Sequence, residues 1–493
     1  MVNNFDDAAA TKDRRKHIVL DAPQGRRRGQ HPWIAIDRGF SRQSASHRRD
    51  TANRGARFGL VLLAALLAVF GLERSAEGAT DSQNCTNDMS DTCLREGIKK
   101  ANKQSTYTIW LGNGQIKLTS ALPPVTTTGW LFIVGQGAGK TTIRGSCKYR
   151  DPADWHCTSG PAGIFTVAKG GALIIQSIRV TNGDNAIFNE GYFASYFSTI
   201  AWNHSGAQRN GGGGIANWGP DSRIYLQDST VNNNYVSFVN DNDPQIGGGG
   251  IFNGFGLVEI VNSTIHSNRA FEGSGGGIAN TGGVLAIANS TIYGNKDDGQ
   301  SFGRFLNHHA GGIVNNRGIG EVWLGSVTIT NNIAYNIYVA GTSADGVFSS
   351  ADSDGLYVFN TIIARNGEKY GSDCGGLVTS LGGNLLGECD VQESSEWDPD
   401  PLVVPRAGDV TGFADPGLEL LRDNGGSSCT VALKPTSPAK NKGWAGAPGS
   451  HGLACAEYDQ RGVRRNRCDI GAYEYDPGAF GGKYTPSGLE CPH

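Results

Sequence analysis

The sequence has few charged residues, no hydrophobic run as long as a membrane span and no Cys-x-x-Cys pair. Only 18% of its 493 residues are charged and the net charge is -3, which excludes a general affinity for nucleic acid or anionic membranes. No two cysteines have the Cys-x-x-Cys spacing that structural zinc sites prefer.

A glycine-rich stretch at residues 135–141 resembles a phosphate-binding loop but has the wrong spacing. Only three residues stand between Gly135 and the Gly139-Lys140 pair, where a P-loop requires four. No helical pattern follows the lysine. We therefore predict a turn between two strands, at residues 130–134 and 142–143.

Glycine and cysteine are the informative residue types. Glycine supplies 72 residues, about twice its usual share of roughly 7%, and its clusters mark turns between β-type segments. The ten cysteines all follow the one strongly apolar run, which favours disulfides formed in an oxidising compartment over free buried thiols. We predict the short-span pairs Cys147–Cys157 and Cys374–Cys389. The pairing of the last four cysteines remains open.

The N-terminal part carries an export signal. An apolar run at residues 59–72 follows Arg54 and Arg57 and precedes small residues, which predicts a signal peptide at 58–79 cleaved after Ala79. The run is shorter than the roughly 20 residues of a membrane span, so we expect no stable span in the mature chain. Residues 1–57 are basic and expected to be disordered. Either the true start lies downstream of them, or they are the cytoplasmic tail of a type II anchor.

A two-part pattern repeats through the middle of the chain. Its first part is Ile-x-Asn, with asparagines at Asn189, Asn217, Asn253, Asn280 and Asn315. Its second part is Thr-Ile/Val-x-x-Asn, with asparagines at Asn203, Asn234, Asn268, Asn295 and Asn332. Successive threonines, from Thr199 to Thr361, are 31, 34, 27, 37 and 33 residues apart. A fixed pattern at this period indicates a solenoid.

The local pattern identifies the solenoid as a parallel β-helix. The repeats are rich in alternating β-branched residues and show no apolar period of 3.6 residues. We expect Ile251, Ile260 and Ile265 to stack on their counterparts one coil away, at the strand separation of about 4.8 Å. The two asparagine series should then stack at two corners. Asparagine tolerates left-handed turn geometry, and its side chain can bond the adjacent coil.

Several stretches resemble a family of secreted bacterial β-helix proteins. Residues 91–98 are similar to the CSLREA-type N-terminal motif, and Leu94, Ile98 and Ala101 would share one face of a short capping helix. Residues 423–426, 437–439, 459–462 and 468–475 resemble a choice-of-anchor Q-type C-terminal region. The resemblance implies a right-handed, pectate-lyase-like parallel β-helix exported from a bacterium. It implies no reaction, because the family has no shared catalytic motif.

The expected organisation follows from these patterns. We predict an all-β chain with a right-handed parallel β-helix and a short N-terminal capping helix at 80–372. A disulfide-containing C-terminal region at 373–493 would continue or cap the helix. The connection that follows the second asparagine of each repeat varies most in length, so insertions should gather along one flank, where repeat proteins often bind.

The candidate site residues lie on this flank. In four successive repeats the residue after the second asparagine is His204, Tyr235, Arg269 or Lys296. The candidates in and beside the insertions are Asp241, Asp243, Arg269, Glu272, Lys296, Asp297, Asp298, His308 and His309. Such loops can also be simply solvated, which is the plainer interpretation of a charged segment.

Two functional hypotheses remain. The favoured one is a secreted or cell-surface protein that binds a polysaccharide or cell-surface glycan along the flank, without a cofactor. Its binding residues would be Asp241, Asp243, Glu272, Lys296 and His309. The alternative is a lyase or hydrolase acting on a uronate-containing polysaccharide, with Arg269 or His308 as the base and Ca²⁺ held by Asp297 and Asp298. Binding is favoured because no catalytic dyad or triad can be assigned from spacing.

Overall fold

The computed structural model describes most of the chain downstream of residue 80. The described residues are 81–148, 156–157, 163–206, 211–237, 247–271, 273–299, 309–316, 320–335, 343–350, 353–367, 372–389, 405–450, 453–475 and 491. They all belong to one compact unit, Thr51–His493. The predictions for residues 1–57 and for the signal peptide at 58–79 fall outside the described residues. Within the described ranges, no helix has the length and apolarity that a membrane crossing requires.

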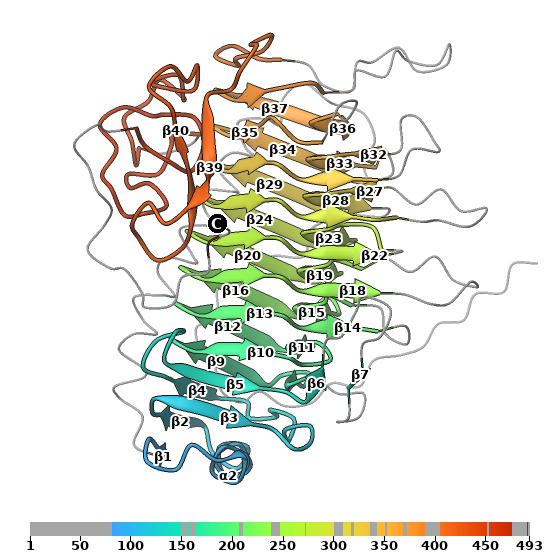
Figure 1. Cartoon of the computed structure of the whole chain (residues 1–493), viewed down its shortest axis with the longest axis vertical. Helices are drawn as coiled ribbons and strands as arrows, with labels where there is room; N and C mark the ends of the chain where they lie inside the picture. Colours follow the sequence, from blue (N-terminus) through green and yellow to red (C-terminus); the bar gives the residue numbers. More distant parts are fainter. Residues whose placement is uncertain are drawn as a thin grey trace, which may run out of the picture. The chain divides into compact units, whose positions relative to one another are not determined.

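Stacked parallel sheets dominate the fold (Figure 1). Sheet A contains, in spatial order, β1 (Ser82–Cys85), β2 (Thr106–Leu111), β4 (Trp130–Val134), β9 (Ala172–Gln176), β12 (Tyr192–Tyr196), β16 (Arg223–Gln227), β20 (Leu257–Val261), β24 (Val284–Ala288), β29 (Glu321–Gly325), β34 (Gly355–Phe359) and β37 (Val378–Gly382). Sheet B contains β3 (Gly114–Lys117), β5 (Thr141–Arg144), β10 (Arg179–Thr181), β13 (Thr199–Ala201), β17 (Thr230–Asn232), β21 (Thr264–His266), β25 (Thr291–Tyr293), β30 (Thr328–Thr330), β35 (Ile362–Ile363) and β38 (Leu385–Leu386).

The third side of each coil is divided between two sheets. Sheet C contains β8 (Phe165–Val167), β11 (Ile187–Asn189), β15 (Ile215–Trp218), β19 (Ile251–Gly254), β23 (Ile278–Thr281), β28 (Ile313–Asn316), β33 (Val347–Ser349) and β36 (Cys374–Gly376). Sheet E contains β14 (His204–Ser205), β18 (Tyr235–Ser237), β22 (Arg269–Phe271), β26 (Lys296–Asp297) and β31 (Ile333–Ala334). Two-stranded sheets add β6 (Cys147–Lys148) with β7 (His156–Cys157), β27 (His309–Ala310) with β32 (Ser343–Ala344), and β39 (Leu418–Arg422) with β40 (Thr430–Leu433).

Each coil visits the sheets in the same order. One coil runs from β16 in sheet A to β17 in sheet B, β18 in sheet E and β19 in sheet C, and β20 then begins the next coil in sheet A. The strands of successive coils pair in parallel, so the chain advances by one strand separation per repeat. The prediction of an all-β parallel β-helix is confirmed. The strands expected at residues 130–134 and 142–143 are present as β4 and within β5.

The interior is built from columns of aliphatic side chains. Ile251 pairs with Ile215 and Ile278, Ile260 with Leu226 and Ile287, and Ile265 with Val231 and Ile292. All nine residues are fully buried. The N-terminal end of this core is closed by the helix α2 (Asp91–Ala101), which buries Leu94, Ile98 and Ala101 as predicted. Its N-cap is Ser90, whose hydroxyl accepts a hydrogen bond from the backbone N–H of Cys93.

Asparagine ladders run along two corners, as the repeat predicted. The amide group of Asn203 donates to the side-chain oxygen of Asn234 at 3.0 Å, and Asn234 repeats this contact with Asn268 at the same distance. The ladder continues through Asn295, Asn332 and Asn366 to Asp373. The second ladder runs from Asn189 through Asn217, Asn253 and Asn280 to Asn315. The prediction of side-chain bonding between coils is confirmed.

The left-handed turn residue lies one position earlier than we expected. Positive φ angles occur immediately before the first ladder's asparagines, at Trp202, Asn233, Ser267, Gly294, Asn331 and Arg365. The ladder asparagines themselves are not among the residues with positive φ. The prediction that asparagine is placed there for left-handed geometry is therefore wrong. The left-handed residue turns the chain, and the following asparagine is then aimed at its neighbour in the next coil.

The C-terminal region first continues the solenoid and then folds back along the outer face of sheet B. Strands β36, β37 and β38 extend sheets C, A and B. Further on, the carbonyl of Cys429 accepts a hydrogen bond from the Thr264 hydroxyl at 2.6 Å. The Ala472 N–H donates to the Thr328 hydroxyl at 3.0 Å. Figure 1 shows β39 and β40 beside the later coils of the solenoid.

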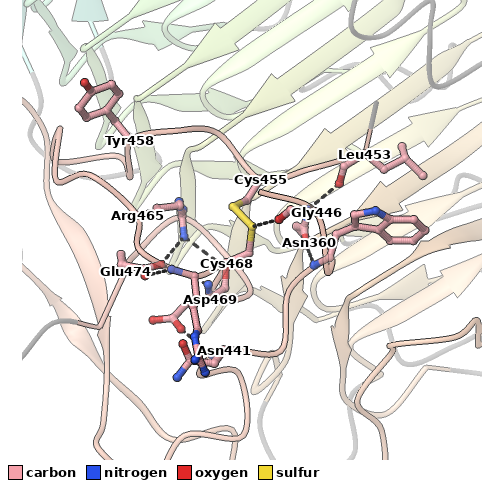
Figure 2. Close-up of a disulfide and its surroundings, with 12 residues drawn as sticks. Asn360, Asn441, Gly446, Leu453, Cys455, Tyr458, Arg465, Cys468, Asp469 and Glu474 are labelled. Carbon is pink, nitrogen blue, oxygen red and sulfur yellow. Dashed lines mark hydrogen bonds and ion pairs between the residues drawn. A yellow bond between two sulfur atoms is a disulfide. The ribbon is translucent and has the colours of Figure 1, made fainter. Parts of the chain in front are cut away.

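Disulfides occur at both ends of the solenoid, and buried ion pairs add to them in the C-terminal region. The predicted Cys374–Cys389 bond is present, together with Cys85–Cys93, Cys429–Cys491 and Cys455–Cys468. Cys147 is also disulfide-bonded, and β6 and β7 place the backbones of Cys147 and Cys157 opposite each other. Figure 2 shows the Cys455–Cys468 bond beside the Arg465–Glu474 ion pair. No free cysteine occurs among the described residues.

Candidate functional site

The predicted flank is formed by sheet E, whose short strands begin directly after the ladder asparagines. Because each of these strands starts at the same point of its coil, His204, Tyr235, Arg269 and Lys296 pair in register in one row. The rings of His204 and Tyr235 stack with their centroids 5.2 Å apart. The Arg269 guanidinium lies over the Tyr235 ring, 5.8 Å from its centroid. The row is therefore a continuous aromatic and cationic stack.

The two ends of this row differ in burial. His204 is 5% exposed, and burial lowers its pKa to about 3, so the imidazole is neutral at physiological pH. Its Nε2 atom lies 2.8 Å from the hydroxyl oxygen of Ser237. At the other end, the Arg269 side chain is 42% exposed and Lys296 is exposed. Only the cationic end of the row is accessible to a ligand.

The two predicted metal-binding aspartates occupy different environments because successive side chains of a strand point to opposite faces. Asp298 lies on the outer face and forms an ion pair with Arg269. Asp297 points inward, in register with Ala270 and Ala334, and is fully buried. Its carboxylate lies 3.0 Å from Nδ1 of His309 and accepts the Gly299 N–H at 3.0 Å.

The Asp297–His309 pair joins β26 to β27 inside the wall of the solenoid. His309 is 1% exposed. Burial alone would lower the pKa of His309, but the adjacent charge of Asp297 and its hydrogen bond outweigh that effect and raise the pKa. A buried, mutually bonded carboxylate and imidazole satisfy each other, so this pair contributes to the wall rather than to the solvent-facing surface.

One exposed residue of the flank was missed by the sequence reasoning. Tyr335 follows β31 directly, its backbone N–H donates to the Asp297 carbonyl at 2.8 Å, and its side chain is 44% exposed. The parallel register places it one coil beyond Asp298. The signal that could have found it is its position three residues after the ladder residue Asn332. We call Arg269, Lys296 and Tyr335 the flank patch.

The remaining predicted residues are only partly covered by the structure. Asp241, Asp243, Glu272 and His308 lie outside the described residues. Arg269, Lys296 and Asp298 are brought together on one face, whereas Asp297 and His309 are buried behind it. Within the described ranges, no group of three or more His, Cys, Asp or Glu side chains is arranged to hold a metal ion. The flank patch is thus cationic and aromatic.

Comparison with known proteins adds no assignment. No model of a protein family matches the chain, and no curated protein matches it. The similarities of residues 91–98 and 423–475 to known motifs therefore stay predictions. The functional argument rests on the geometry of this chain.

Proposed function

We propose that this chain is a secreted β-helix protein that binds an acidic polysaccharide through the flank patch. The observation that carries the proposal is the register of Arg269 beside Lys296 in sheet E. It places two cations about one strand separation, roughly 4.8 Å, apart on the same face. Exposed Tyr335 lies one coil further along the same flank.

The chemistry of the flank patch matches a polysaccharide that carries carboxylates. Guanidinium and ammonium groups form charge-assisted hydrogen bonds with carboxylates, and a planar guanidinium can do so with two bonds. The ring of an exposed tyrosine offers an apolar surface to the C–H face of a sugar, while its hydroxyl stays in water. A polymer lying across successive coils would meet these groups in order.

Binding fits the flank patch better than catalysis. The lyase hypothesis needs Asp297 and Asp298 for a cation and Arg269 or His308 as a base, and His308 lies outside the described residues. Asp297 is bonded to His309 and to the Gly299 N–H, and Asp298 is paired with Arg269. A planar guanidinium donates hydrogen bonds in a fork that matches a carboxylate, which suits the recognition of an anion.

The proposed location is outside the cell. The disulfides of the described residues are typical of proteins that fold in oxidising compartments, and they support the export signal at 58–79. The parallel β-helix is compatible with a pectate-lyase-like, bacterial surface protein. A fold of this kind hosts many functions, so the flank patch and not the fold carries the proposal.

The test is calorimetric titration of the secreted chain with polygalacturonate, alginate and a neutral glucan. We expect binding of the acidic polymers and no unsaturated product by ultraviolet absorbance, with or without Ca²⁺. The double variant Arg269→Gln/Lys296→Gln should bind about tenfold more weakly, which corresponds to about 1.4 kcal/mol. Arg464→Gln removes an equivalent exposed charge from the C-terminal region and serves as the control.

Two results would overturn this proposal. One is the absence of binding to every acidic polymer tested. The other is equal affinity for the wild-type chain and the Arg269→Gln/Lys296→Gln variant. Accumulation of unsaturated product would instead establish the lyase hypothesis.

A further inference from the structure

We propose a second ligand site on the outer face of sheet B, built to take a short sugar that carries carboxylate or sulfate groups. A cavity of about 350 Å³ lies over the first coils of this sheet. Its volume falls at the lower end of the range typical of small-molecule sites, roughly 300–1,000 Å³. It is lined by Gln115, Ala138, Gly139, Thr142, Arg144, Arg179, Thr181, Asn182 and Trp202. We call these residues the sheet B cavity.

The sheet B cavity occupies the part of this face that the C-terminal region leaves open. Among the described residues, hydrogen bonds from the C-terminal region to the sheet B side of the solenoid begin at Asp228, whose carboxylate accepts from Ser427. They continue at Thr264 and Thr328 in later coils. Strands β3, β5 and β10, which carry the cavity together with Trp202 just after β13, precede all of these contacts. The same sheet face therefore docks a protein segment at one end and is hollowed at the other.

Two arginines make the sheet B cavity cationic. Thr142 pairs with Arg179 and Arg144 pairs with Thr181 across β5 and β10, so the two guanidinium-bearing residues are diagonal neighbours. One strand separation and two residues along a strand place their Cα atoms about 8 Å apart. No carboxylate is among the described residues that line the cavity. A ligand with two acidic groups could therefore contact both arginines without meeting a like charge.

Arg179 also departs from the pattern of its own row. In register along the outer face of sheet B, the positions after it hold Thr199, Thr230 and Thr264. Threonine is a β-branched residue that suits a strand, and the later threonines serve as docking points for the C-terminal region. Arg179 therefore stands where the later coils of this row have threonine, and it adds a cationic group to this part of the sheet face.

Trp202 is the second departure. It has a φ of 57°, in the left-handed region, and its side chain is 43% exposed. At the same turn of later coils the left-handed residue is polar or glycine, namely Asn233, Ser267, Gly294, Asn331 or Arg365, so Trp202 is the aromatic member of this row. A left-handed backbone costs a bulky residue about 1–2 kcal/mol, and the 43% of Trp202 that stays exposed contributes nothing to offset that cost. A ligand that covers the exposed part of the ring would add burial at this position.

The glycine-rich loop beside the cavity does not act as a phosphate cradle. Its N–H groups are used within the fold: Gly135 donates to the Gln176 carbonyl and Gly137 to the Ser177 carbonyl, both at 2.9 Å. Lys140 and Thr141 both donate to the Gly137 carbonyl. A phosphate cradle needs several backbone N–H groups aimed at the ligand. The groups in this cavity that could recognise a ligand are therefore the indole of Trp202 and the guanidinium groups of Arg144 and Arg179.

An acidic sugar uses both kinds of group. The apolar face of a sugar ring stacks on an indole, and its carboxylate or sulfate oxygens accept charge-assisted hydrogen bonds from a guanidinium. The sheet B cavity lies on a different sheet from the flank patch, so this site is separate from the one proposed above. It would hold a short oligosaccharide or the end of a chain rather than a long polymer.

The test uses the full secreted chain and short ligands. Oligogalacturonates of two to four units supply the carboxylate arm, sulfated disaccharides supply the sulfate arm, and cellobiose is the neutral control. Calorimetry gives the affinity, and tryptophan fluorescence reports contact with the indole. We expect at least one acidic arm to bind and to change the fluorescence, and cellobiose to bind more weakly or not at all.

The matched variants come from the molecule itself. Trp202→Asn introduces the residue found at the same turn of the next coil, so it should fold with an unchanged or higher melting temperature and bind at least tenfold more weakly. Arg144→Gln/Arg179→Thr should lower affinity to a similar extent and reduce its salt dependence. Arg464→Gln should bind normally. The proposal is overturned if neither acidic arm binds, if cellobiose binds as well as the acidic sugars, or if Trp202→Asn binds like the wild type.

The flank variant separates the two proposals. Arg269→Gln/Lys296→Gln should retain the binding of short acidic sugars, because its changes lie on sheet E. If that variant abolishes the binding and Trp202→Asn does not, the short ligands occupy the flank patch and the sheet B cavity is not a site.

Discussion

The ladder residue Asn268 offers the sharpest test of how the solenoid is held together. Its side chain is fully buried and makes four hydrogen bonds. The side-chain oxygen accepts the backbone N–H and the amide group of Asn234, each at 3.0 Å. The side-chain amide donates to the Val231 carbonyl at 2.9 Å and to the side-chain oxygen of Asn295 at 3.0 Å.

Replacing Asn268 by leucine should be strongly destabilising. The amide group of Asn234 keeps its bond to the Ile200 carbonyl, but the Asn234 backbone N–H loses its partner inside the wall. An unsatisfied buried donor costs about 1–3 kcal/mol, and each net hydrogen bond lost adds about 1 kcal/mol. We expect Asn268→Leu to lose about 2–4 kcal/mol, measured as a shift of the denaturation midpoint of the disulfide-intact chain.

Asn268→Asp is the matched control, because it keeps the shape and the acceptor and removes the donor. At neutral pH the introduced carboxylate faces the side-chain oxygen of Asn295 in a desolvated wall, which raises its pKa above the usual aspartate value of about 3.9. The folded state then binds the proton more tightly than the unfolded state. Stability should therefore rise as the pH falls through the raised pKa, where a protonated carboxyl can donate. The ladder account fails if Asn268→Leu melts like the wild type, or if Asn268→Asp shows the same pH dependence as the wild type.

Two further predictions concern the outer faces. Burial raises the pKa of Glu259 from its ordinary value of 4.5 to about 7, so the folded state loses stability as the pH rises between these values. Glu259→Gln should raise stability by about 1–3 kcal/mol at pH 8 and leave it unchanged near pH 4, as followed by thermal melting at each pH. Gln460 donates to the Thr264 hydroxyl at 2.8 Å and accepts the Thr291 hydroxyl at 2.6 Å. Gln460→Ala should weaken docking of the C-terminal region by about 2–4 kcal/mol, seen as faster limited proteolysis near residue 450 while the solenoid melts as before.

The solenoid could be predicted from the sequence because its stabilising contacts join identical positions of successive repeats. Ile251 pairs with Ile215 and Ile278, and Asn253 is hydrogen-bonded to Asn217 and Asn280. Each coil therefore needs the same residue types as its neighbours at equivalent positions. A contact of this kind appears in the sequence as a period. The helix α2 was predictable for a similar reason, since its buried residues recur at helical spacing.

The path of the C-terminal region could not be predicted, because its contacts have no period. Gln460 bonds Thr264, 196 residues earlier in the chain, and Ala472 bonds Thr328, 144 residues earlier. From the sequence alone, the threonines of sheet B can be identified only as residues that favour strands. Its second role, as a docking surface, depends on partners that carry no repeat.

The candidate site was predictable at the level of the flank but not of the individual residue. Asp297 and Asp298 are adjacent and chemically alike, yet one is fully buried with His309 and the other faces outward with Arg269. Which of the two points inward depends on where the two-residue strand β26 begins. A sequence pattern does not locate the first residue of a strand to within one position.

The direction of the ladders explains where carboxylates belong in this fold. Each asparagine donates its amide group to the next coil, so the last member must accept without donating onward. Asp373 ends the first ladder and accepts both the backbone N–H and the amide group of Asn366. Asp409 does the same for Asn384, with hydrogen bonds of 2.9 and 3.1 Å. A carboxylate is an acceptor on both oxygens, which suits these ends better than another amide.

This assignment bears on function, because these carboxylates already have hydrogen-bond or ion-pair partners and are not available for catalysis. Asp373 and Asp409 terminate ladders, Asp297 is bonded to His309, and Asp298 is paired with Arg269. A lyase or hydrolase would need carboxylates held near a ligand without such partners. The flank patch, by contrast, presents the exposed Lys296 and Tyr335 beside Arg269. These outward groups are the basis for proposing that the chain holds an acidic glycan rather than cuts one.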